Sequence, residues 1–485
     1  MTAQPLALSR ETPLAEGIVA WWRARIEDRI VRPGVRLPSI RRFAADQRVS
    51  RHTVVEAYQR LVELGYFEAR RGSGFYVRPR PLPGGRALRH AAAPASRIDV
   101  PWLLRSMFRD LPYDRMPGGG LLPPEWLDSG LIAASARSVA RAAKRSWLAY
   151  GAPQGYLPLR QQLSLKLSAV EIPAEPEQIV TTAGVTHAID LAARHFLEPG
   201  DAVLVDDPGW FVMFARFAML GARVIGVPRN ADGPDVDALR ALMAAHRPKL
   251  FVLSSVLHNP TGTSMTAASA YAVLQLAEEH GVTLVEDDIY GDLSPDAPSH
   301  APARPAPVRL AAMDRRRRVI YIGGFSKTLA ANLRVGYLVA PPDLVQPLTD
   351  QKLLGTLTTP EFGERVVARV LLERRYARHC AALRQRLDAA RRTVVMRLQK
   401  LGARGFAPDG QGMFLWADVG TDTNELATRL FDAGYLAAPG SLFSPTQLPS
   451  TWMRFNVASS QDPAMWRALG ETRREGRPRT SSTSG

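Results

Sequence analysis

The 485-residue sequence contains a single cysteine, Cys380, so no internal disulfide can form and a reducing, cytoplasmic location is expected. It also lacks any apolar run near the ~18 residues that a membrane-spanning helix needs. The first residues lack the basic segment and apolar core of a secretory signal peptide. These absences argue against membrane and secreted classes of protein. We expect no metal site.

Lysine is absent from residues 1–90, although this segment is strongly basic. It carries 17 arginines and 8 acidic residues, a net charge of +9, out of +16 for the whole chain. Arginine charge concentrated in one segment is typical of proteins that bind nucleic acid. An arginine-rich genome would raise the charge of the whole chain instead, and composition alone leaves both explanations open.

Residues 10–80 carry the pattern of a small helical domain that ends in a hairpin. Apolar residues recur at helical spacing over 14–30. Ser39 and Ser50 are suitable N-caps for a short helix through Ala45 and for a longer helix over 51–64. Two short apolar stretches then flank a basic, glycine-containing tip at 70–74. A helix–turn–helix followed by a basic hairpin predicts a winged helix that binds double-stranded DNA.

The stretches LPSIRRFA, VSRHTV, AYQRLVELGY and RRGSGFYV resemble the GntR-type winged helix. The first turn of the helix after Ser50 is where a recognition helix meets base edges. The resemblance places DNA-contacting positions at Arg41, Ser50, Arg51, His52, Thr53 and Gly72.

Two segments show no steady hydrophobic period. Residues 81–112 begin with Pro81, Pro83 and two glycines and continue as a mixture of Ala, Arg and Pro, which predicts a flexible linker. Residues 471–485 end in RPRTSSTSG, which predicts a disordered tail.

Residues 113–470 alternate short apolar runs with stretches of helical spacing. This alternation predicts an α/β body with a mostly parallel sheet, whose ligand groups gather at the strand ends. The predicted strands are Ile179–Thr182, Ala202–Val205, Arg223–Val227, Leu250–Ser254, Thr283–Glu286, Val319–Ile322 and Gly336–Val339.

Lys327 follows one of these strands and two glycines. An amine at the end of a buried strand can be desolvated, which lowers its pKa and favours Schiff-base formation. Arg334 follows on the same loop and can hold a phosphate with two hydrogen bonds. Together they indicate a site for pyridoxal 5′-phosphate (PLP). A Ser-Lys pair alone is weak evidence, because a surface lysine in a turn would look the same.

Other strand ends supply the groups that such a cofactor needs. Gly184, Val185 and Thr186 open a helix whose N-terminus can hold a phosphate. Trp210 offers a ring to stack on the pyridine, and Asn259 and Tyr290 offer donors to its phenolic oxygen. Asp287 offers an acid for the ring nitrogen, and Arg454 offers a cation for a substrate carboxylate. Each could instead be an ordinary turn, core or capping residue. Their shared position at strand ends favours the cofactor.

In this order the residues resemble the fold-type I aminotransferase family across 113–470, whose fold adds a smaller α+β subdomain. The motif YGAPQG at Tyr150–Gly155 matches the family segment that crosses to the neighbouring subunit. The resemblance implies a homodimer in which Tyr150 reaches the partner's cofactor phosphate. It implies Lys327 as the Schiff-base lysine, with Asp287 and Tyr290 as the other catalytic residues. Gly324 departs from the pattern, because many members have Ser or Thr there.

A GntR-like winged helix joined to an aminotransferase-like body resembles the MocR family of transcriptional regulators. The resemblance implies a regulator that senses PLP, or a small amino-acid or amine effector, through an internal aldimine at Lys327. A second hypothesis is an active aminotransferase with an appended DNA-binding domain, since Asn259 and the other cofactor residues are present. A third is a body retained only for dimerisation, against which the intact set of cofactor residues argues.

Overall fold

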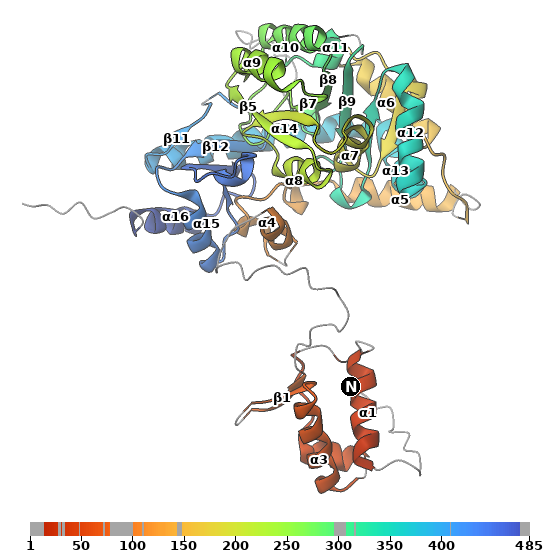
Figure 1. Ribbon diagram of the computed structural model, residues 1–485, viewed down its shortest axis with the longest axis vertical. Coiled ribbons are helices and arrows are strands. Elements are labelled where there is room, and N and C mark those ends of the chain that lie inside the picture. Colours follow the sequence, from red (N-terminus) through yellow and green to blue (C-terminus); the bar gives the residue numbers. More distant parts are fainter. Residues whose placement is uncertain are drawn as a thin grey trace, which may run out of the picture. The chain divides into compact units, whose positions relative to one another are not determined.

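The computed structural model describes residues 14–27, 31, 34–47, 49–70, 73–77, 100–108, 111–142, 148–294, 307–314, 317–407 and 409–475. The chain divides into two compact units, Met1–Pro94 and Ala95–Gly485 (Figure 1). Each unit has its own hydrophobic core.

The smaller unit has the predicted winged-helix order of elements. Three helices, α1 (Leu14–Glu27), α2 (Ile40–Gln47) and α3 (Arg51–Glu63), precede the antiparallel hairpin of β1 (Phe67–Arg70) and β2 (Gly74–Val77). Aromatic rings fill its core, where the centroids of Tyr58 and Phe67 lie 5.1 Å apart. The Ser50 hydroxyl accepts a hydrogen bond of 3.0 Å from the backbone N–H of Thr53 and caps α3. Gly72, at the predicted hairpin tip, lies outside the described residues.

The larger unit is built on an eight-stranded sheet in the order β3-β10-β9-β8-β7-β4-β5-β6. The strands β9, β8, β7, β4 and β5 run parallel, and β10, β3 and β6 are antiparallel to their neighbours. The bounds are β3 (Ile179–Thr182), β4 (Ala202–Asp207), β5 (Arg223–Asn230), β6 (Gly233–Pro234), β7 (Leu250–Leu253), β8 (Thr283–Asp287), β9 (Val319–Gly324) and β10 (Gly336–Val339). All seven predicted strands are present, which confirms the α/β class.

Helices cover this sheet, and one long helix connects it to a smaller sheet. The α-helices are α5 (Ser129–Ala142), α6 (Leu157–Ser168), α7 (Val185–Phe196), α8 (Phe211–Met219), α9 (Val236–His246), α10 (Ala267–His280), α11 (Leu310–Met313), α12 (Pro342–Thr356) and α13 (Glu361–Leu372). The 26-residue α14 (Arg375–Lys400) then leads to a four-stranded antiparallel sheet in the order β11-β12-β14-β13. That sheet consists of β11 (Arg404–Gly405), β12 (Phe414–Asp418), β13 (Ala438–Pro439) and β14 (Trp452–Asn456), with α15 (Thr423–Asp432) and α16 (Pro463–Glu475) beside it.

Two predicted boundaries differ from the structure. Residues Val100–Met107, within the predicted linker 81–112, form helix α4. Val100 and Leu103 are buried in the core of the larger unit, so tertiary packing gives this short stretch a helical structure. At the other end, α16 continues to Glu475, past the predicted start of the tail at 471.

Among the described residues, no helix is long and apolar enough to cross a membrane. The same part of the chain contains no group of three or more His, Cys, Asp or Glu side chains placed to hold a metal ion.

Candidate functional site

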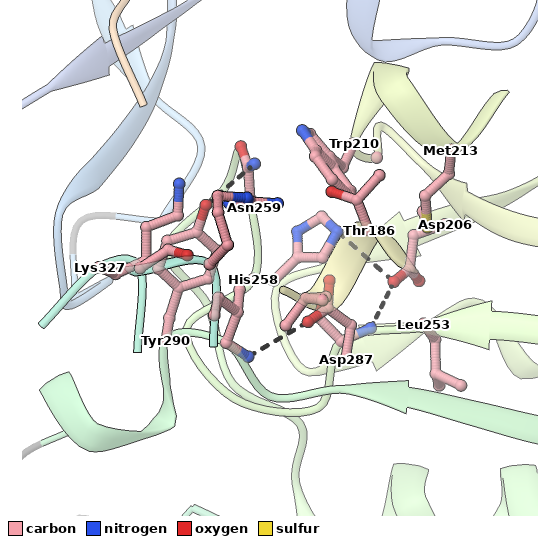
Figure 2. A pocket seen from close by; sticks show the side chains of 16 residues that line it. Thr186, Asp206, Trp210, Met213, Leu253, His258, Asn259, Asp287, Tyr290 and Lys327 are labelled. Atoms are coloured by element: carbon pink, nitrogen blue, oxygen red, sulfur yellow. Dashed lines mark hydrogen bonds and ion pairs between the residues drawn. The ribbon is translucent and has the colours of Figure 1, made fainter. Parts of the chain in front are cut away.

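A pocket of the larger unit lies where β4, β7, β8 and β9 end, which is the edge at which parallel strands present ligand groups (Figure 2). It brings together most of the residues predicted from the strand ends. Its lining consists of Val185, Thr186, Asp206, Gly209, Trp210, Met213, Leu253, Ser254, His258, Asn259, Asp287, Ile289, Tyr290, Ser326, Lys327 and Arg334.

Lys327 projects into this pocket beside Tyr290, with its amine nitrogen 5.7 Å from the centre of the tyrosine ring. The amine donates a hydrogen bond of 2.8 Å to the carbonyl oxygen of Gly120. Burial, together with the positive charges of Arg454 and Arg334, lowers the pKa of Lys327 to about 8. A much larger fraction of this amine is therefore neutral near pH 7 than of an ordinary lysine.

Asp287 is the last residue of β8 and is buried in the same pocket. One carboxylate oxygen accepts a hydrogen bond of 3.2 Å from the backbone N–H of Ile289. Burial raises the pKa of Asp287 to about 7, and the neighbouring Asp288 acts in the same direction. A cationic ring nitrogen placed beside this carboxylate would stabilise its charged form.

Asn259 and Tyr290, which line the pocket, form a hydrogen-bonded chain with Arg454, which is not among the lining residues. The Asn259 amide nitrogen donates to the Tyr290 hydroxyl at 3.4 Å, and its oxygen accepts from an Arg454 guanidinium nitrogen at 2.9 Å. Burial raises the pKa of Tyr290, with Asp287 also contributing, so its hydroxyl keeps its proton and can donate it in a hydrogen bond.

Arg454 lies on β14, in the smaller sheet, and only 2% of its surface is exposed. A second guanidinium nitrogen donates to the Gly118 carbonyl oxygen at 2.6 Å, and the side chain lies over the ring of Phe414 at 4.4 Å. Its Nε atom is buried without a hydrogen-bond partner. Burial lowers the pKa of Arg454 to about 10. An incoming carboxylate would stabilise this guanidinium.

Gly184 and Arg334 form a cradle at the N-terminus of α7. Gly184 has φ 79° and directly precedes the helix, so the first backbone N–H groups of α7 are available to an anion. The Arg334 guanidinium donates to the Ala183 carbonyl oxygen at 2.9 Å. A Cβ atom on Gly184 would lie 2.6 Å from an Arg334 nitrogen, so any other residue there would force the guanidinium out of its present position.

Trp210 lines another side of the pocket, at the residue before α8. Ser326 also lines it, next to Lys327. Gly324, the departure from the family pattern, is tightly packed, because a Cβ atom there would meet the Ile289 side chain at 3.0 Å. A serine at 324 would therefore have to displace its neighbours.

Sequence reasoning missed a buried polar cluster at the pocket floor. Asp206 accepts hydrogen bonds of 3.0 Å from Arg229 and from the backbone N–H of Ser254, and it lies 3.5 Å from the His258 imidazole. Burial lowers the pKa of His258 well below its ordinary value, with Arg229 also contributing, so the imidazole is neutral. His258 is adjacent to Asn259 in the sequence, and this adjacency was the only available signal.

Some predicted residues lie elsewhere. Tyr150 is 80% exposed and does not line its own chain's pocket. In the smaller unit, Arg41 on α2 and Arg51 and His52 in the first turn of α3 are exposed. Thr53 is half-buried, and its hydroxyl lies 2.7 Å from that of Ser50.

Comparison with known proteins agrees with both units. Residues 124–471 match the family model described as aminotransferase class I and II, and residues 14–77 match the bacterial regulatory proteins of the gntR family. The chain is 31% identical to the HTH-type transcriptional regulator TauR of Rhodobacter capsulatus, covering 85% of this chain and 86% of TauR.

Two further proteins extend the comparison. The probable rhizopine catabolism regulatory protein MocR of Rhizobium meliloti is 30% identical, over 70% of this chain and 68% of that protein. The α-aminoadipate aminotransferase LysN of Thermus thermophilus, crystallised with N-(5′-phosphopyridoxyl)-L-leucine, superposes with a TM-score of 0.68 at 26% identity, covering 77% of this chain and 94% of LysN. The chain therefore belongs to the MocR-type transcriptional regulators, in which a GntR helix–turn–helix domain precedes a class I and II aminotransferase domain.

Proposed function

We propose that this protein is a DNA-binding transcriptional regulator that binds PLP at Lys327 and senses PLP itself or a small amino-acid or amine effector. The observation that carries the proposal is that one chain combines an exposed recognition-helix turn at Arg51 and His52 with the Lys327 pocket. Action on chromosomal DNA would require the protein to reside in the cytoplasm.

The pocket residues fit PLP in charge and in hydrogen-bonding chemistry. The Gly184–Arg334 cradle suits a phosphate, and Asp287 suits the ring nitrogen. Asn259 and Tyr290 suit the phenolic oxygen, and the remaining ring contacts fall to Trp210. When bound, PLP supplies an aldehyde that reacts with amines and a ring that withdraws electrons. The lowered pKa of Lys327 provides the neutral amine for that aldehyde.

A backbone segment links the two functional cations of the site. Lys327 donates to the carbonyl of Gly120, and Arg454 donates to the carbonyl of Gly118. Attachment of the cofactor would remove the Lys327 hydrogen bond, and a bound carboxylate would compete for the Arg454 donor. Residues 118–120 would therefore lose hydrogen bonds both when the cofactor attaches and when a carboxylate binds.

This segment can also transmit a signal along the chain. It follows α4 in the sequence, and α4 in turn follows the stretch that joins the two units. We infer that release of the Gly118 and Gly120 carbonyls changes the position of α4 and thereby the DNA affinity of the smaller unit. Such coupling requires the effector to bind the two arrangements unequally.

We further propose a homodimer in which each chain supplies Tyr150 to its partner's site. Tyr150 is exposed on its own chain, while the segment behind it is firmly held. The amide of Gln154 donates to the Glu177 and Ile179 carbonyl oxygens at 2.6 and 3.1 Å, and the Thr181 N–H donates to the Gln154 carbonyl oxygen at 2.9 Å. A rigid base carrying an exposed aromatic residue is suited to contact a second subunit.

An alternative function is catalysis as a PLP-dependent aminotransferase. The specific observation in its favour is that Arg454, which would hold a substrate carboxylate, donates a hydrogen bond to Asn259. Asn259 lines the same pocket as Lys327 and would contact the cofactor ring. A screen of amino acids for keto-acid release by the PLP-loaded protein tests this alternative.

The regulator proposal is tested by a gel-shift titration at physiological salt, using DNA from the protein's own locus. Arg51→Ala should weaken specific binding at least about tenfold, as expected for loss of a base-contacting arginine. Arg60→Ala, an exposed residue at the other end of α3, is the matched control and should leave binding nearly unchanged. Lys327→Ala should abolish the effect of PLP or effector on DNA affinity. If the protein binds specific DNA with an affinity that neither PLP nor any amino acid changes, the sensing role is rejected.

A further inference from the structure

A second pocket of the larger unit lies between α14 and the short helix η2 (Pro124–Trp126), and we call it the arginine pocket. Four of its residues come from the N-terminal half of α14, where helical spacing places them on one face: Arg375, Arg378, His379 and Arg386. The complete lining is Glu125, Trp126, Leu127, Asp128, Arg375, Arg378, His379, Ala382 and Arg386.

The arginines of this pocket retain unused hydrogen-bond donors. Arg375 lies 3.6 Å from Asp128, a long contact, and the other oxygen of Asp128 accepts the Leu131 N–H at 2.8 Å. Arg378 has no hydrogen-bond or ion-pair partner among the described residues. Arg386 makes one long hydrogen bond of 3.5 Å to the Trp126 carbonyl oxygen. Three guanidinium groups thus surround a hollow in which only Asp128 and Glu125 carry negative charge.

We propose that the arginine pocket binds a small dianion of the phosphate-monoester type. Guanidinium groups hold phosphate oxygens through paired hydrogen bonds, and three of them around one hollow can satisfy several oxygens at once. The Arg386 guanidinium carbon lies 6.0 Å from the centre of the Trp126 ring, so one face of the ligand would border an aromatic side chain.

The arginine pocket is connected to Lys327 through Thr328. The His379 imidazole Nε2 lies 2.7 Å from the Thr328 carbonyl oxygen, and the Tyr376 hydroxyl lies 2.7 Å from the Thr328 hydroxyl. Thr328 is fully buried and directly follows Lys327. A dianion drawn against the first turns of α14 therefore acts on two residues that fix the lysine's neighbour. This part of the inference rests on the proposed function, because it makes the anion a second effector of the cofactor site.

The test is a calorimetric titration of the full-length, PLP-saturated protein with inorganic phosphate, at constant ionic strength set with chloride. Saturation with PLP keeps the probe out of the Gly184–Arg334 cradle. We expect one phosphate per chain, and at least about tenfold weaker binding in Arg378→Ala. Arg240→Ala is the matched control, since Arg240 is an exposed arginine of the same unit paired with the exposed Glu279. It should bind phosphate like the unaltered protein.

The coupling has its own readout. Phosphate should change the absorption band of lysine-bound PLP or its rate of release. Tyr376→Phe removes a hydroxyl that contacts Thr328 and lies outside the pocket lining, so it should remove that change while leaving phosphate binding within about threefold. The site would be overturned if no phosphate bound at concentrations below about 10 mM, or if Arg378→Ala and Arg240→Ala lost phosphate affinity equally. An unaltered cofactor response in Tyr376→Phe would overturn the coupling alone. DNA binding is measured separately, so failure of the regulator proposal is distinguishable from failure of this site.

Discussion

Lys327 acquires its reactivity from its surroundings rather than from its own chemistry. Its pKa of about 8, against 10.5 for the ordinary side chain, results from burial and from the positive charges of Arg454 and Arg334. The neutral fraction is then ~1% at pH 6 and ~50% at pH 8. Because only the neutral amine attacks the cofactor aldehyde, the rate of PLP attachment should rise about tenfold per pH unit below pH 7 and level off above pH 8.

Stopped-flow absorbance at several pH values would measure this profile. Arg454→Ala removes a nearby positive charge, so the pKa of Lys327 should rise and the profile should move to higher pH. The exposed Arg404, paired with Asp418, serves as the control, and Arg404→Ala should leave the profile in place. A rate independent of pH between 6 and 8 would contradict the lowered pKa.

Gly184 is the second residue whose identity is tightly restricted, here by its backbone angles and by the space beside Arg334. At φ 79° and ψ 169°, a region of backbone conformation that only glycine adopts readily, an alanine costs roughly 1–3 kcal/mol of strain, and its Cβ would also displace Arg334. Gly281→Ala is a matched control, because Gly281 has φ 66° and nothing within 4 Å of the added Cβ. Both variants should lose stability in urea unfolding, Gly184→Ala the more, but only Gly184→Ala should weaken PLP binding, by about tenfold or more. Equal PLP affinities in the two variants would argue against the cradle.

At the scale of elements, the segment Tyr150–Tyr156 is held at its end by a buried carboxylate from α13. Glu364 accepts hydrogen bonds of 2.7 Å from the Tyr156 N–H and from the Thr181 hydroxyl. The fully buried Lys352 donates to the Thr181 hydroxyl at 3.3 Å, and burial lowers the pKa of Lys352 to about 8 although Glu364 opposes the shift. The negative charge of Glu364 thus compensates a buried lysine.

Glu364→Ala should therefore destabilise the larger unit by roughly 3 kcal/mol, because it leaves buried donors and a buried lysine without their partner. Glu373→Ala, which removes only an exposed pair with Arg369, should cost less than about 1 kcal/mol. Urea unfolding of the two variants measures the difference. Similar small losses in both would show that the Glu364 network adds little to stability.

The difference between local and long-range contacts explains what was predictable from the sequence. The strands around Leu250 and Val319 were readable because short apolar runs are local signals. The positions of Asp287 and Lys327 followed from the rule that parallel strands present ligands at their ends. Glu364 and the Asp206–Arg229 pair were not predictable, because their contacts join residues that are far apart in the sequence.

At the scale of the whole molecule, the order of the domains was predictable, but their limits were not. Helix α4 lies in a region whose Pro, Gly, Ala and Arg content indicated a linker. Its structure depends on Val100 and Leu103 packing into a core formed by residues later in the chain. Propensity alone seldom fixes a helix this short.

Separate cores predict that the two units unfold separately. The residues proposed to bind PLP all belong to the larger unit. Saturation at about 100 times the dissociation constant should therefore stabilise that unit by roughly 2.7 kcal/mol and leave the unfolding transition of the smaller unit unchanged. Lys327→Ala should remove the shift. Leu61→Ala, which empties a fully buried position of α3, should lower only the other transition, by roughly 2–5 kcal/mol.

Differential scanning calorimetry of the full-length protein, with and without PLP, distinguishes these outcomes. Two transitions, each moved by one perturbation only, would show that cofactor occupancy does not change the stability of the DNA-binding unit. Regulation would then act through the placement of intact winged helices rather than through their folding. A single transition moved by both PLP and Leu61→Ala would instead show that the cofactor stabilises the DNA-binding fold directly.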